Sequence, residues 1–299
     1  MRLSAAQLRQ EISARNVERG AQFEYEVSAS ATPSVIYSGA RGNFLPSSYA
    51  RIAANPEWRR RLTKVYTASR FVPRAADRRR YELECANSSD ALLMNVFCYP
   101  RVMDSPGLRG LLGVERGTKP EFGVRARIPL KSGREDRTEI DMRLGALLVE
   151  AKLTEGDFQR AEMRLLERYA QAEGVFEVAA LPVRGGVVHG WQLIRGVLAA
   201  HAWGAAFTVV CDGRRGDLVE MWYAVMRAVS DCGLRTRLGL LTWQETAAHL
   251  PPRVQRFLRE KYGIEGEPRR GGAGVVHRGT VRGEGRFLPD RRTVDYERP

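Results

Sequence analysis

The stretch TEIDMRLGALLVEAKLTE, residues 138–155, decides how this 299-residue chain folds. Side chains alternate between two faces along a strand, so Glu150 and Lys152 point the same way while the apolar residues beside them point to the other face. Asp141 stands nine residues before Glu150. A tight turn at Gly145 would therefore fold one strand back on the other and bring the two carboxylates together.

Two converging carboxylates form the hard, oxygen-rich kind of site that Mg²⁺ or Mn²⁺ prefers, with positions left for water and a substrate phosphate. Lys152 beside them can orient or help deprotonate an attacking water and stabilise developing negative charge. Only five of the 48 basic residues are lysines, and an ammonium handles protons where a guanidinium cannot. The pattern predicts metal-assisted phosphodiester hydrolysis, and a surface hairpin with a cross-strand ion pair is the alternative.

Outward from this hairpin, the hydrophobic pattern alternates between strands and helices. An N-cap at Ser88 or its neighbours predicts a short helix ended by Pro100. The sequence further predicts strands at 124–130, 138–143, 147–153, 205–211 and 237–243, and helices at 158–169, 190–203, 217–230 and in a terminal stretch ending near 262. The expected class is α/β, with a central mixed four- to five-stranded sheet flanked by helices and a basic helical N-terminal extension.

This order of elements, with Asp141 on one strand and Glu150-Ala151-Lys152 on the next, resembles the PD-(D/E)xK nuclease superfamily over residues 84–245. The resemblance implies a restriction-endonuclease-like core in which Asp141 and Glu150 bind the metal and Lys152 acts on the nucleophilic water. The proline that often precedes the first acid is replaced here by Ile140.

The resemblance extends to two helices of uncharacterised bacterial members, which read like Ser88-Ser89-Asp90-Ala91-Leu92 and Gln192-Leu193-Ile194-Arg195. It leads us to expect a further acid on a helix, for which Glu84 is the candidate and Glu82 and Asp90 are rivals. Gln192 and Arg195 are neighbours on one helix face, and related nucleases suggest that such a pair holds the scissile phosphate. A solvated helix flank explains the same pair equally well.

The formal net charge of +13, with a pI of about 10.0, favours a polyanionic partner. Residues 1–80 carry 15 basic and 6 acidic side chains, whereas residues 81–263 carry 25 and 23. Arginines at 59–61 and 78–80 bracket Trp58, Tyr66 and Phe71, which fits either a phosphate-contacting surface or a solvated helix face. We expect a basic N-terminal region at 1–83, a nuclease-like domain at 84–262 and a flexible Gly/Arg-rich tail at 263–299.

Several other functions and locations are disfavoured. The chain contains no nucleotide-binding glycine loop and no nucleophile elbow for acyl transfer. Four scattered cysteines and four scattered histidines predict reduced thiols rather than disulfides or a zinc site. Without an apolar leader or a long apolar run, we expect a cytoplasmic protein that does not bind membranes.

The sequence thus predicts a nuclease that uses Mg²⁺ or Mn²⁺, with DNA as the expected substrate by resemblance. One alternative is a non-catalytic nucleic-acid-binding protein that retains the nuclease fold. A structural or partner-binding protein with an arginine-rich composition is a second alternative.

Overall fold

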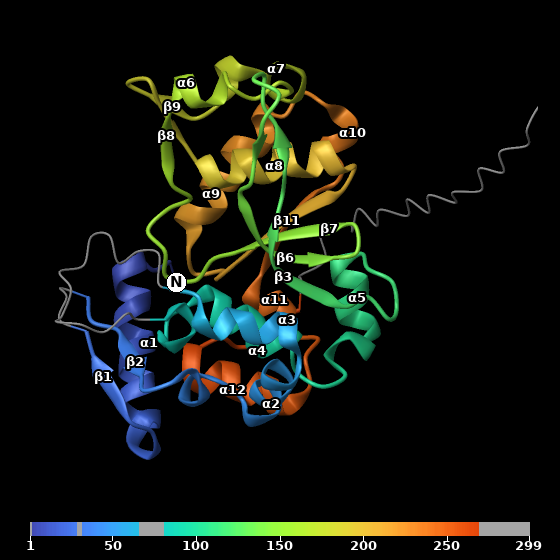
Figure 1. Cartoon of the computed structure of the whole chain (residues 1–299). Coiled ribbons are helices and arrows are strands. Elements are labelled where there is room, and N and C mark those ends of the chain that lie inside the picture. The colour runs from blue at the N-terminus through green and yellow to red at the C-terminus, as the bar shows by residue number, and fades with distance from the viewer. Residues whose placement is uncertain (1, 29–31, 66–80, 269–299) are drawn as a thin grey trace, which may run out of the picture.

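A five-stranded mixed sheet runs through the centre of the computed structural model, which describes residues 2–28, 32–65 and 81–268 (Figure 1). The strand order is β12-β11-β7-β6-β3. Pairing is antiparallel from β3 through β6 to β7, and parallel from β7 through β11 to β12. The five strands are β3 (Pro120–Arg125), β6 (Glu139–Leu144), β7 (Leu147–Ala151), β11 (Ala206–Cys211) and β12 (Leu238–Thr242). The predicted α/β class with a mixed sheet is confirmed.

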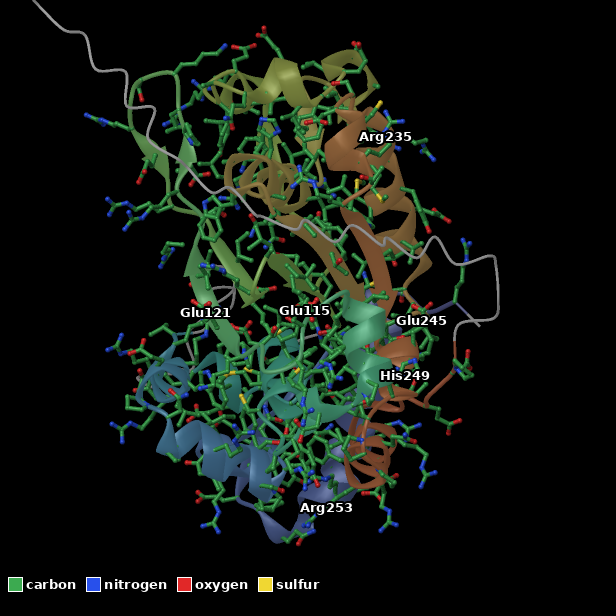
Figure 2. The ribbon with its side chains drawn as sticks, turned by 90° about the vertical axis from the view of Figure 1, so that its right-hand side faces the viewer. Glu115, Glu121, Arg235, Glu245, His249 and Arg253 are labelled. Atoms are coloured by element: carbon green, nitrogen blue, oxygen red, sulfur yellow. The ribbon has the colours of Figure 1, made fainter. Side chains whose placement is uncertain are left out.

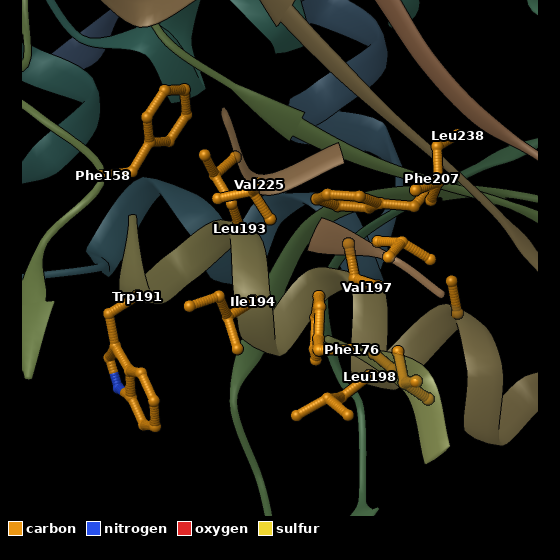
Figure 3. Close-up of a cluster of buried hydrophobic side chains, with 14 of the residues drawn as sticks. Phe158, Phe176, Trp191, Leu193, Ile194, Val197, Leu198, Phe207, Val225 and Leu238 are labelled. Atoms are coloured by element: carbon orange, nitrogen blue, oxygen red, sulfur yellow. The ribbon is translucent and has the colours of Figure 1, made fainter. Parts of the chain in front are cut away.

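Helices cover both faces of this sheet. Side chains of β7 pack against the helices on both faces, because successive side chains of a strand point to opposite sides. Leu148 belongs to the cluster that contains α8 (Trp191–Trp203) and α9 (Gly216–Ala228), which Figure 3 shows around α8. Val149 belongs to the cluster on the other face, with α1 (Ala5–Arg19) and α4 (Ser89–Phe97). The strand is therefore buried on both sides, as expected for a strand between parallel and antiparallel neighbours.

Shorter elements complete the described part of the chain. The α5 helix (Pro106–Leu112) lies against the connection between α11 (Trp243–Ala247) and α12 (Pro252–Tyr262), where the Ser105 hydroxyl donates to the backbone carbonyl of His249 at 2.9 Å (Figure 2). The remaining helices are α2 (Pro46–Ala54), α3 (Pro56–Arg59), α5 (Pro106–Leu112), α6 (Met163–Leu166), α7 (Ala172–Val175), α10 (Cys232–Arg235), α11 (Trp243–Ala247) and α12 (Pro252–Tyr262). The remaining strands are β1 (Tyr25–Val27), β2 (Val35–Tyr37), β4 (Ile128–Pro129), β5 (Glu135–Asp136), β8 (Arg160–Glu162), β9 (Val183–Arg184) and β10 (Val187–His189).

The helix predicted over residues 158–169 is wrong. The segment begins with Gln159, whose φ of 65° leaves the helical region, and continues as β8, which pairs antiparallel with β10. Only the single turn of α6 is helical there. Phe158 and Leu166 are still buried, so the apolar residues were identified correctly while their period was misread.

The N-terminal region packs into the same core as the rest. Leu8 and Ile12 of α1 lie in one cluster with Met142 and Val149 of the central sheet. Trp58 is buried, and its indole N–H donates to the carbonyl of Pro120 at 3.1 Å. The expected division at residue 83 therefore marks a change in charge and not a gap in packing.

Two further predictions concern the described residues. Cys85, Cys98 and Cys211 are buried, whereas Cys232 is exposed. Within the described ranges, no helix is long and apolar enough to cross a membrane. Tyr66, Phe71, the arginines at 78–80 and most of the predicted tail lie outside the described residues.

Candidate active site

The antiparallel hairpin of β6 and β7 builds the site. Leu144 pairs with Leu147 and Met142 with Val149, so the turn has two residues. Gly145 opens this turn with a φ of 59°, which suits the glycine-first turns that match strand twist. The paired register ends at Met142 and Val149, one residue before Asp141 and Glu150, and just beyond it the two carboxylates lie close enough for Glu150 to raise the pKa of Asp141.

Asp141 is fixed by the neighbouring strand. Its Oδ2 accepts a hydrogen bond from the backbone N–H of Ala151 at 2.8 Å. Burial, the Glu150 carboxylate and then the Asp90 carboxylate raise the pKa of Asp141 well above its usual range, and Lys152 opposes them. A carboxyl group in these surroundings gains free energy from a proton or from another cation.

Glu150 and Lys152 form a buried ion pair on the same face of β7. The Lys152 Nζ lies 2.6 Å from Glu150 Oε1, and the two side chains are only 6% and 4% exposed. Burial opposes the charged ammonium, but the carboxylates of Glu150, Glu155 and Asp141 raise the pKa of Lys152 above its ordinary value. Lys152 is therefore protonated at neutral pH.

The backbone of Lys152 is held from both sides. Its N–H donates to the carbonyl of Val210 on β11 at 2.8 Å, and its carbonyl accepts from the indole of Trp243 at 2.9 Å. The ammonium also lies 5.7 Å from the centre of the Phe158 ring. These contacts fix the lysine before any substrate arrives, which is the preorganisation that a catalytic group needs.

A second ionic cluster lies beside this pair. Lys64 Nζ lies 2.7 Å from Asp90 Oδ2 and 2.9 Å from Glu139 Oε1, and Arg61 contacts the same two oxygens at 2.6 and 2.9 Å. Arg61 also lies where a side chain on Gly123 of β3 would be, so this glycine leaves room for the guanidinium. We call these four residues, Arg61, Lys64, Asp90 and Glu139, the ionic quartet.

The quartet was not predicted as a unit. Arg61 had been interpreted as part of a phosphate-contacting surface or a solvated face, but it is buried and paired with two carboxylates. Among the three candidates for a helix-borne acid, Asp90 is the one whose charge raises the pKa of Asp141. Burial, then Asp90 and Glu155, raise the pKa of Glu82 to about 7. Glu84 accepts instead from the backbone N–H of Tyr81.

Gln192 and Arg195 lie at the start of α8. The backbone N–H of Gln192 donates to the carbonyl of Phe158 at 2.9 Å. Phe158 is the residue whose ring faces the Lys152 ammonium. The guanidinium of Arg195 lies 3.9 Å from Asp136 and 5.8 Å from the ring centre of Trp191. The structure thus brings Asp141, Glu150 and Lys152 together and gives Gln192 and Arg195 other contacts.

The carboxylates suit a divalent cation of the magnesium type. Within the described ranges no group of three His, Cys, Asp or Glu side chains is arranged to hold a metal ion. Magnesium is nonetheless commonly bound through one or two carboxylates, with water and substrate phosphate filling the other positions. Asp141 and Glu150 supply two such carboxylates, and burial together with the neighbouring carboxylates raises the pKa of Asp141.

Comparison with known proteins adds one finding. A family model described as "Restriction Endonuclease associating with ARP" matches residues 6–263. No curated protein and no solved structure matches the chain. The match includes α1 and the first strands as well as the β6–β7 hairpin, in agreement with the shared packing of α1 and this hairpin.

Proposed function

The chain belongs to the family of restriction endonucleases associating with ARP, and from this premise we propose that it hydrolyses phosphodiester bonds of DNA with the help of Mg²⁺ or Mn²⁺. Membership suggests nuclease activity and interaction with nucleic acid. The observation that carries the proposal further is the closeness of Asp141 to Glu150 at the end of the β6–β7 pairing, with the Lys152 ammonium 2.6 Å from Glu150.

In this proposal Asp141 and Glu150 hold the cation. Asp141 has one oxygen committed to the Ala151 N–H, which leaves the other oxygen as a ligand. Glu150 shares one oxygen with Lys152 and also keeps one for the cation. A divalent cation bound there would polarise the scissile phosphate and lower the pKa of a water molecule.

Lys152 acts through its positive charge. The neighbouring carboxylates raise its pKa and so favour the charged form, which donates hydrogen bonds. We assign it to orienting the attacking water and stabilising the charge on the phosphate oxygens in the transition state. The surplus of basic residues in the first 80 positions supports binding of the nucleic acid, because phosphate contacts supply most of such affinity.

We place this activity in the cytoplasm, since Cys232 is an exposed free thiol and Cys98 and Cys211 are buried ones. Exposed free thiols persist where glutathione keeps them reduced.

The test is cleavage by the full chain. Supercoiled plasmid, single-stranded DNA and RNA are incubated with Mg²⁺, with Mn²⁺ and with a chelator. We expect cleavage of DNA that the chelator stops and that Asp141→Asn and Lys152→Met abolish, while the exposed Lys131→Met serves as the matched control. Cleavage that persists in the chelator or in both variants contradicts the proposal, and salt-sensitive binding without cleavage supports a non-catalytic nucleic-acid-binding protein instead.

A further inference from the structure

A two-stranded β ribbon leads away from the candidate active site. Arg125 of β3 pairs with Glu139 of β6, and after two residues on each strand Ile128 of β4 pairs with Asp136 of β5. Neither strand has an extra residue, so the segments 120–129 and 135–144 form one antiparallel ribbon. It rises from the central sheet beside α8 (Figure 1).

One face of the β ribbon is covered and the other is open. Ala126 and Ile128 are buried in the cluster that contains α8, and Thr138 is buried as well. Arg127 lies between the first two residues and is exposed, and Arg137, which precedes Thr138, is also exposed. Buried and exposed residues thus alternate, as they do on a strand with one solvated face, and both arginines belong to the open face.

The two arginines lie across the β ribbon from each other. The Ala126 N–H donates to the carbonyl of Thr138 at 2.9 Å, so the two strands stay together between the paired segments and Arg127 faces Arg137. In the part of the chain that the structure describes, neither guanidinium forms an ion pair or a hydrogen bond. Like charges directly opposite destabilise a strand pair, so an anion bound between the two arginines would relieve their repulsion.

The carboxylates on the open face do not neutralise this pair. Arg125 donates to the carbonyl of Arg137 at 3.2 Å and lies 3.8 Å from Glu139, which already has two cations of the ionic quartet as partners. Glu135 is exposed, and among the described residues it forms no ion pair. Three arginines therefore share the open face of the paired strands with two carboxylates, one of which is already neutralised.

The spacing along the β ribbon suits a nucleic-acid backbone. Arg137 precedes Asp141 by four residues on one strand, and strands rise about 3.3 Å per residue, which separates the two positions by roughly 13 Å. One strand of a DNA duplex advances about 3.4 Å per nucleotide, so about four nucleotide steps cover this distance. Guanidinium groups bind phosphate oxygens through two parallel hydrogen bonds, and two guanidinium groups can hold one phosphate from both sides.

We propose that Arg127 and Arg137 bind a backbone phosphate of the nucleic acid about four nucleotides from the bond that is cleaved. The strand then runs along the open face of the β ribbon toward Asp141 and Glu150. This inference rests on the proposed nuclease function. It makes the two arginines positioning residues, and because they contact the backbone alone, they bind without regard to base sequence.

The test measures how the affinity of the full chain for a short labelled duplex depends on salt, in a chelator. Each phosphate contact contributes about 0.9 to the slope of log affinity against log salt. Arg127→Ala combined with Arg137→Ala should therefore reduce the slope by about 2, whereas the two lysine substitutions should keep it, because they retain the charge. The charge-matched control is Arg253→Ala with Arg256→Ala, two exposed arginines of α12 at the other end of the molecule (Figure 2). It should leave the slope unchanged.

A second measurement locates the contact. A duplex that the wild type cuts at a mapped bond is prepared with one neutral methylphosphonate in place of each phosphate in turn. A neutral linkage about four nucleotides from the cut should slow cleavage by the wild type. It should not slow the double alanine variant of Arg127 and Arg137 further, because that variant already lacks the contact.

Three results would overturn the inference. In the first, the full chain does not bind the duplex at low salt. In the second, the two double alanine variants reduce the slope equally, which would show only a loss of general charge. In the third, the neutral linkages slow the wild type and the double variant alike at every position. Binding with the expected slopes but without cleavage in Mg²⁺ or Mn²⁺ would refute the proposed function and leave the phosphate-binding surface in place. Chelator-sensitive cleavage with an unchanged slope would refute the surface alone.

Discussion

Replacement of Asp141 by asparagine should abolish cleavage and, at the same time, stabilise the fold. Asp141 lies near Glu150 where the pairing of the hairpin ends, and both burial and this carboxylate raise its pKa. The ionised carboxyl group therefore costs stability unless a cation binds. Asparagine has nearly the same shape, and its amide oxygen can still accept the hydrogen bond from the Ala151 N–H.

The size of the effect follows from the closeness of the two carboxylates, since the Glu150 charge raises the pKa of Asp141. Charges that shift a pKa in this way lie about 4–6 Å apart, and two unit charges at that distance repel by about 3–4 kcal/mol at an effective dielectric constant near 20. Lys152, at 2.6 Å from Glu150, offsets part of this repulsion. We therefore expect Asp141→Asn to stabilise the protein by about 1–3 kcal/mol, with each kcal/mol raising Tm by about 2–4 °C in a protein of this size.

Thermal unfolding followed by circular dichroism checks the prediction at neutral pH, in a chelator and in millimolar Mg²⁺. The wild type should gain Tm with Mg²⁺, because a ligand that binds only the folded state stabilises it, and the variant should gain little. Asp104→Asn, at a half-exposed carboxylate paired with Arg101, is the matched control and should change Tm only slightly. A variant that is no more stable than the wild type in the chelator, or that keeps the full Mg²⁺ response, would refute the reasoning.

Three further substitutions test other parts of the structure. Lys152→Met leaves Glu150 buried without its cation and should cost about 3–5 kcal/mol in urea unfolding; adding Glu150→Gln should restore most of that loss, and no restoration would count against the ion pair. Gly123→Ala should cost more than about 1 kcal/mol, because φ is 66° there and the new methyl group would collide with Arg61; a neutral result in the same assay would show that Arg61 moves freely. Burial lowers the pKa of Lys261 well below its usual value. Above this lowered pKa the unfolded chain therefore binds more protons than the folded protein, and the stability of the wild type rises with pH. The rise ends at the pKa of the unfolded lysine, near 10.4. Lys261→Met should lack this slope, and its advantage over the wild type should shrink between pH 7 and 10; parallel pH curves would exclude the explanation.

The hairpin of β6 and β7 could be predicted from the sequence because its information is local. Strand alternation assigns the faces, Gly145 supplies the turn, and nine residues of separation then set Asp141 against Glu150. The helix α4 was equally accessible, since the Ser88 side chain accepts from the Ala91 N–H as an N-cap does. In both cases the determining residues lie within one turn or one strand of the structure that they determine.

The ionic quartet could not be predicted because its partners are distant in sequence. Arg61 is 29 residues from Asp90 and 78 from Glu139, and an arginine in a basic run gives no sign that it will be buried. The helix prediction for residues 158–169 is wrong for a related reason. Its apolar spacing fits a helix, but Gln159 takes a positive φ, and the pairing of β8 with β10 overrides the local preference.

The N-terminal basic residues therefore do more than attract a polyanion, because two of them enter the charge balance of the candidate active site. Among the less exposed side chains at the β6–β7 hairpin, four carboxylates face three cations, and these seven residues are Asp90, Glu139, Asp141, Glu150, Arg61, Lys64 and Lys152. Arg125, which lies 3.8 Å from Glu139, is 62% exposed and is left out of this buried set. One negative charge is left over, and Glu155, which raises the pKa of Lys152, adds another. If Arg61 and Lys64 were removed, Asp90 and Glu139 would be left unpaired near Asp141 and would raise the cost of ionising it further. The ionic quartet thus keeps the excess of negative charge at the site small enough for the folded protein to remain stable. The excess is still large enough to favour a bound cation.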